Sequence, residues 1–101
     1  MLREVIGNAA MLEQTAEECA ELAQACLKMA RHLRGENKVY GKTVMEMYDH
    51  LCEEVADVKI CMEELTEKDG LFDERDILMW QEHKRSRMRR RLNLDGGDIC
   101  E

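Results

Sequence analysis

Apolar residues recur in the first third of this 101-residue chain in alternating steps of four and three. This spacing places them along one side of an α-helix, which turns once in about 3.6 residues. The row consists of Leu12, Ala16, Cys19, Ala23, Cys26, Ala30 and Leu33. It predicts a helix over residues 9–34, preceded by a short turn and capped by Asn8. The small side chains of the row allow another helix to approach closely.

Two more helices are predicted after a loop at residues 34–42. Thr43 and Glu46 form a capping box at the start of the first of them, which should end near Gly70. Its expected inward-facing residues are Val44, Met47, Leu51, Val55, Val58, Met62 and Leu65. Asp73 is the expected cap of the last helix. That helix includes Ile77, Trp80, Met88 and Leu92.

The composition also favours helices. The chain contains no proline and few glycines, and only 4% of its residues are aromatic. Strong helix formers, among them Leu, Met, Ala, Glu, Lys and Arg, dominate. We therefore expect an all-α bundle of three to four helices per chain, in a single domain over residues 1–95. A flexible tail is expected at residues 96–101.

The cysteines and the N-terminus indicate the compartment. The five cysteines form no C-x-x-C pair, and an odd number fits poorly with a disulfide framework. Cys19, Cys26 and Cys61 are expected in the core of a protein from a reducing, cytoplasmic compartment. No apolar run approaches the ~20 residues of a membrane span, and residues 1–10 lack the apolar segment of a signal peptide. No membrane partner is expected.

Two acidic blocks carry the chemistry that the sequence suggests. The acids Glu18 and Glu21 lie three residues apart in the first block, as do Glu54 and Asp57 in the second. Each pair therefore projects from one side of a predicted helix. Two such helices lying antiparallel would bring four carboxylates together, and a fold tolerates this repulsion mainly when a cation neutralises it. Ligands that are all oxygen favour Mg²⁺, or alternatively Mn²⁺.

A solvated acidic surface is the alternative interpretation of these blocks. Glu46 and Asp49 have the same spacing, as do Glu64 and Glu67. Spacing alone therefore does not separate ligands from surface acids. The first block also shares one helical stripe with Gln14 and, two turns on, Lys28. Such a stripe suits a metal at its acidic part and a phosphate group of a substrate near Lys28.

In combination, the motifs resemble a known family. The chain carries E-E-x-x-E at Glu17, Glu18 and Glu21, and E-x-x-D at Glu54 and Asp57. This combination resembles the MazG-like, all-α nucleoside triphosphate pyrophosphohydrolases, relatives of the dimeric dUTPases and of phosphoribosyl-ATP pyrophosphohydrolase. The likeness covers about residues 10–92, through QTAEECAELAQACLK, LCEEVADVKICMEEL and HKRSRMRRRL. The segment between the two motifs is longer than in many members.

The resemblance implies an enzyme and its site. Mg²⁺ would be bound by Glu18, Glu21, Glu54 and Asp57, with Glu17 as an accessory catalytic carboxylate. The implied reaction is attack by water on the α-phosphorus of a nucleoside triphosphate, which gives monophosphate and pyrophosphate. Whether such an enzyme cleanses the nucleotide pool stays open at this point. The expected substrate-binding residues are Gln14, Lys28, Lys84, Arg87 and Arg91.

Two other functions stay open at this point. The chain is acidic, with a net charge of −7, but residues 84–91 hold six of its fifteen Lys and Arg residues. A non-catalytic helical adaptor would use this basic helix to bind a partner, and a nucleic-acid-binding protein would use it on phosphates. The histidines show no E-x-x-H spacing, which argues against a di-iron bundle. The apolar surface of the first two helices predicts a homodimer or a dimer of dimers.

Overall fold

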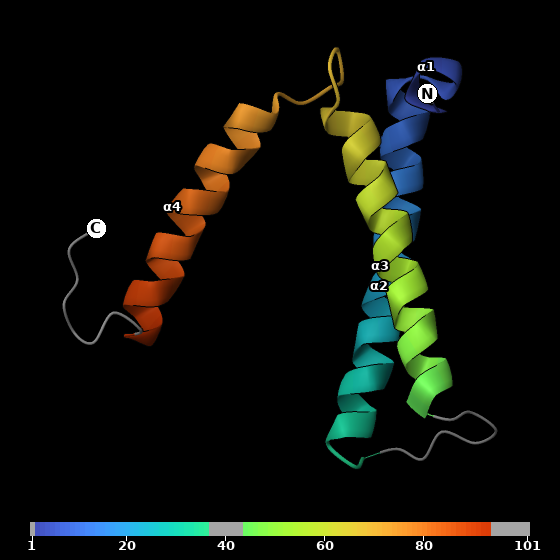
Figure 1. The fold of residues 1–101 in the computed structure, drawn as a ribbon, viewed down its shortest axis with the longest axis vertical. Coiled ribbons are helices and arrows are strands. Elements are labelled where there is room, and N and C mark those ends of the chain that lie inside the picture. Colours follow the sequence, from blue (N-terminus) through green and yellow to red (C-terminus); the bar gives the residue numbers. More distant parts are fainter. Residues whose placement is uncertain (1, 37–43, 94–101) are drawn as a thin grey trace. The chain divides into compact units, whose positions relative to one another are not determined.

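The computed structural model describes residues 2–36 and 44–93, and all regular secondary structure in them is helical. The four helices are α1 (Leu2–Ile6), α2 (Asn8–Leu33), α3 (Val44–Thr66) and α4 (Glu74–Leu92), shown in Figure 1. This confirms the prediction of an all-α chain. The chain divides into two compact units, Met1–Leu65 and Thr66–Glu101. The single domain expected over residues 1–95 stays a prediction, and the expected cap Thr43 and tail 96–101 lie outside the described residues.

The helix boundaries follow from local chemistry. Gly7, with a φ of 88°, separates α1 from α2 in a conformation that favours glycine. Asn8, the expected cap, is instead the first residue of α2, and Gly7 occupies the cap position without a side-chain hydrogen bond. The prediction for Asp73 is confirmed, because its Oδ1 accepts a 2.9 Å hydrogen bond from the backbone N–H of Arg75. Residue Thr66 ends α3, before the glycine expected to stop it.

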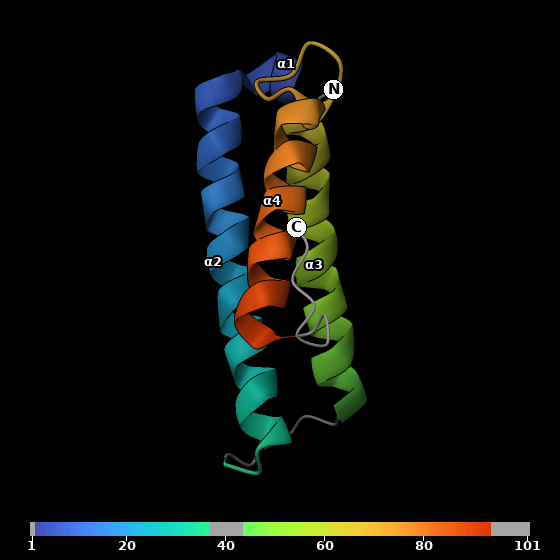
Figure 2. The ribbon, with the colours of Figure 1, turned by 90° about the vertical axis from the view of Figure 1, so that its left-hand side faces the viewer.

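In the first unit α2 and α3 run antiparallel along each other, as both Figure 1 and Figure 2 show. One row of buried or half-buried residues of α2 recurs in steps of four and three and consists of Met11, Thr15, Glu18, Leu22 and Ala25. The matching row of α3 consists of Met47, Leu51, Glu54, Val58, Cys61 and Leu65. The buried Thr15 satisfies its hydroxyl by donating a 2.7 Å hydrogen bond to the carbonyl oxygen of Met11.

The apolar row expected to pack in the core lies one position further along α2 and is exposed except at Ala30, which is half-buried. Leu12 is 41% exposed and Leu33 is 76% exposed, and the prediction that Cys19 and Cys26 lie in the core is wrong. Cys61 is buried as predicted, and burial raises the pKa of its thiol. The row that packs against α3 contains Thr15 and Glu18, so hydrophobicity alone favours the wrong side of the helix. Three further residues expected to face inward are exposed, namely Val44, Val55 and Met62.

The short helix α1 is hydrogen-bonded to α3 near the C-terminal end of α3. The backbone N–H of Arg3 donates a 2.8 Å hydrogen bond to Oε1 of Glu64, and its side-chain Nε donates one of 3.0 Å to the carbonyl oxygen of Glu64. Glu64 is buried. Glu64 therefore has a structural role, and its E-x-x-E spacing with Glu67 does not mark a pair of metal ligands.

The second unit leaves its apolar side chains in contact with solvent. None of the residues of α4 is buried, and Trp80, Met88 and Leu92 are more than half exposed. A groove of about 580 Å³ runs along this surface between Leu71 and Met88. The ring of Trp80 packs edge to face on His83, with 5.7 Å between ring centroids. In the described part of the chain, no helix is long and apolar enough to cross a membrane.

Candidate metal centre

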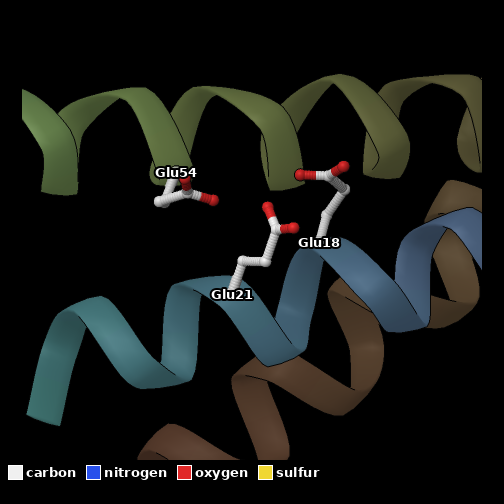
Figure 3. Close-up of side chains that lie close together, drawn as sticks. All are labelled: Glu18, Glu21 and Glu54. Atoms are coloured by element: carbon white, nitrogen blue, oxygen red, sulfur yellow. The ribbon is translucent and has the colours of Figure 1, made fainter.

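Three carboxylates meet at the middle of the pair formed by α2 and α3. Glu18 and Glu21 project from α2 and Glu54 projects from α3 (Figure 3). One oxygen from each side chain lies within 4.8 Å of the others. In residues 2–36 and 44–93 this is the one group of three or more possible ligands that converge in this way. The predicted convergence of these acids from two antiparallel helices is confirmed.

Asp57 joins the same cluster. Its carboxyl group interacts with that of Glu18, and the carboxyl groups of Glu21 and Glu54 interact in the same way. Both contacts therefore pair an acid of α2 with an acid of α3. The four predicted ligand residues therefore form one cluster between the helices.

The cluster is poorly solvated for its charge. Glu54 is only 6% exposed, and burial raises its pKa, to which the negative charge of Glu21 adds. Burial likewise raises the pKa of Glu18, followed by the charges of Asp57 and Glu21. The Oε2 atoms of Glu18 and Glu54 are buried and have no hydrogen-bond partner. Two buried acceptors without donors, among carboxylates that repel each other, are the environment that a hard divalent cation satisfies.

Glu18 and Glu54 each have a polar neighbour four residues earlier on their own helix. Nε2 of Gln14 donates a 2.8 Å hydrogen bond to Oε1 of Glu18. Nδ1 of His50 lies 3.9 Å from Oε1 of Glu54, and this contact lowers the pKa of Glu54 against the larger effect of burial. In both acids the neighbour approaches Oε1, and Oε2 is the atom without a partner. Gln14 thus orients Glu18, and its role in substrate binding stays a prediction.

His50 is not among the site residues expected from the sequence. Its i, i+4 spacing from Glu54 was the available signal, because residues four apart are neighbours on a helix. Glu17 is exposed, and so is Lys28, two turns beyond Glu21 on the same helix. Lys84, Arg87 and Arg91 are exposed residues of α4, in the other compact unit.

The raised pKa values predict an unusual pH dependence for the metal-free protein. Because the folded chain holds protons on Glu18 and Glu54 above their usual pKa of 4.5, it binds more protons than the unfolded chain. The free energy of unfolding contributed by these groups should therefore be highest below pH 4.5 and fall as the pH rises through the raised values. Asp73 affects the free energy of unfolding only at lower pH, because hydrogen bonds from Arg75 lower its pKa from 3.8.

Urea denaturation followed by circular dichroism, without divalent metal, tests this dependence between about pH 4.5 and 7.5. The variant with both Glu18→Gln and Glu54→Gln should show a flatter profile, because it lacks the two groups that titrate. A free energy of unfolding that rises with pH equally in both proteins would contradict the prediction.

No protein-family model, curated protein or solved structure matches this chain.

Proposed function

We propose that the chain is a Mg²⁺-dependent nucleoside triphosphate pyrophosphohydrolase. The observation that supports this most is the convergence of Glu18, Glu21 and Glu54, with two buried carboxylate oxygens that have no partner. A solvated acidic surface would not bury such atoms without a donor. The likeness of the two acidic motifs to the MazG-like family supplies the reaction, and the adaptor function lacks a comparable supporting observation.

Glu18, Glu21, Glu54 and Asp57 would hold the Mg²⁺, with Mn²⁺ as an alternative. When bound, the cation would screen the phosphate charges, lower the pKa of a coordinated water and stabilise negative charge on the leaving group. The two neighbours keep the ligands in position. Gln14 fixes Oε1 of Glu18 by its hydrogen bond, and His50 lies beside Oε1 of Glu54. In both cases Oε2 stays available inside the cluster.

The reaction forms one bond and breaks one. The oxygen of water would bond to the α-phosphorus as the bond between that phosphorus and the α–β bridging oxygen breaks, with release of pyrophosphate. The attacking water releases a proton to the surrounding solvent. Glu17, which is exposed and directly precedes Glu18, is the proposed accessory carboxylate that orients this water. Lys28, an exposed cation on the same helix, is proposed to contact a phosphate oxygen.

A panel of nucleoside triphosphates with common and modified bases tests the proposal. We expect release of pyrophosphate, not orthophosphate, from at least one of them, and only with Mg²⁺ or Mn²⁺ present. If no triphosphate is turned over with either metal, the function as a helical adaptor becomes the better interpretation.

The basic helix α4 distinguishes a hydrolase from a nucleic-acid-binding protein. Lys84, Arg87 and Arg91 share one stripe of α4, and Arg89 lies on another. If the first stripe binds substrate phosphates through the donor fork of arginine, Arg87→Ala should lower kcat/KM roughly tenfold, a loss typical of one charged hydrogen bond. Arg89→Ala should have little effect.

The same two variants test the alternative. A nucleic-acid-binding protein would lose oligonucleotide affinity in both, and that affinity would fall steeply with added salt. Equal, small kinetic effects together with a steep salt dependence would favour nucleic-acid binding.

We also propose that the protein acts as a homodimer or a dimer of dimers. Large apolar side chains are exposed on both long helices of the first unit, among them Leu27, Tyr48 and Ile60. Such surface on a small unit is usually covered by a partner. A monomer mass in light scattering at micromolar concentration would disprove this proposal.

A further inference from the structure

The side of α2 that α3 leaves uncovered carries a row with two-fold symmetry in its sequence. Read from either end, the residue types are Leu, Ala, Cys, Ala, Cys, Ala and Leu. The members of this palindromic row are Leu12, Ala16, Cys19, Ala23, Cys26, Ala30 and Leu33. The row is centred on Ala23, so an antiparallel copy of the helix would meet each residue with one of its own kind. In a two-fold interface each contact of residue i with residue j of the other copy is repeated with i and j exchanged, and here both residues of each pair are of the same type.

The palindromic row is accessible in the described structure. All its members are exposed except Ala30, which is half-buried, and the adjacent Leu27 is 58% exposed. The residues of α2 that are fully buried, among them Met11 and Ala25, belong to the neighbouring row and not to this one. Alanine and cysteine side chains along the middle let a second helix approach closely, while the leucines at each end add apolar area.

The edge of the row specifies the direction of pairing. Glu13, Ala20, Leu27 and Arg34 recur every seven residues, each directly after a Leu or Cys of the row. An antiparallel partner places Glu13 beside Arg34 of the partner subunit, and Ala20 beside the partner's Leu27. Opposite charges meet and a small side chain meets a large one. Parallel pairing in register would lack the contact of Glu13 with Arg34 of the partner subunit, because these residues lie at opposite ends of the row, and such flanking charges set helix orientation.

We propose that two copies of the chain associate through the palindromic row, with their α2 helices antiparallel and the two-fold axis near Ala23. The inference specifies the interface of the oligomer proposed above and does not depend on hydrolytic activity. The occupant is a second copy because the row is complementary to itself in size and in charge.

Charge exchange in the full-length protein tests the proposal by sedimentation equilibrium. Glu13→Arg would place two arginines together at each end of the interface, and Arg34→Glu would place two acids there. Each variant should raise the dimer dissociation constant about tenfold or more, and the double variant should restore it to within about threefold. If neither single variant weakens the dimer, or if the double variant is as weak as the singles, the proposal is wrong.

A second variant tests the centre of the interface. Ala23→Glu would bring two carboxylates together at the axis and should give a monomer with unchanged helix content by circular dichroism. Ala56→Glu, at an exposed position of α3, is the matched control and should leave the mass unchanged. A dimer that survives Ala23→Glu would refute this interface alone. A wild-type monomer would refute both this interface and the proposed oligomer, and would leave the hydrolase proposal untouched.

Discussion

Replacing Glu54 by Gln is expected to reduce pyrophosphate release by roughly 10²-fold or more, the usual scale for loss of one charged group that stabilises a transition state. Gln has the size of Glu but lacks the charge that attracts a divalent cation. The metal-free protein should be as stable as the wild type or more so, because one of four repelling acids has been neutralised. Glu21→Gln should behave in the same way.

Two measurements separate lost catalysis from lost structure. The value of kcat/KM is measured at saturating Mg²⁺, and the melting temperature Tm is measured with and without Mg²⁺. Wild-type protein should gain stability from the metal, since a ligand bound only to the folded state stabilises it. Glu53→Gln, on an exposed neighbour in α3, is the matched control and should keep both properties. A Glu54→Gln protein that is fully active, or unfolded, would disprove the role of Glu54 as a ligand.

Leu65→Ala is expected to destabilise the first unit by about 2–5 kcal/mol, the range for truncating a fully buried leucine. Leu65 is 1% exposed and forms one cluster with Met11 and Cys61. Few other side chains share this core, so the structure has little means of filling the cavity. Because a small domain is stable by only about 5–15 kcal/mol, a large part of that stability would be lost.

The midpoint and slope of urea denaturation, followed by circular dichroism, measure this loss. Ile60→Ala is the control, because Ile60 lies on the same helix and is 53% exposed. It should change the free energy of unfolding by no more than about 0.5 kcal/mol, as exposed substitutions usually do. Equal losses in the two variants would mean that Leu65 is not part of a core.

The three long helices and most of their ends could be predicted from the sequence, because they depend on local chemistry, whereas the segment expected to be a short turn before α2 is the helix α1. The absence of proline and the periodic apolar residues predict long helices, and the cap at Asp73 depends on its own side chain. Asn8 is not the cap because Gly7, with its positive φ, occupies the cap position one residue earlier.

The buried side of α2 could not be predicted from hydrophobicity. Two rows run along this helix one residue apart, and the apolar one is exposed. The row that packs on α3 includes Thr15 and Glu18, and the row of α3 includes Glu54. Polar residues in core positions interrupt the apolar periodicity from which the buried side of a helix is predicted. Such a disagreement between sequence pattern and structure is expected at functional sites. The acidic motifs are visible in the sequence. The burial of Glu54 and the position of His50 beside it are visible only in the structure.

The attachment of α1 to Glu64 has a consequence for the kinetics of folding. The two hydrogen bonds join residues 61 positions apart in the sequence. Contacts of high sequence separation require closure of a long loop, so they form after the local contacts that shorten it. We expect the pairing of α2 with α3 to precede the docking of α1. Glu64→Ala should then accelerate unfolding and leave the refolding rate nearly unchanged, because the contact is absent from the transition state. The first residues of the chain would thus limit how fast the folded unit opens.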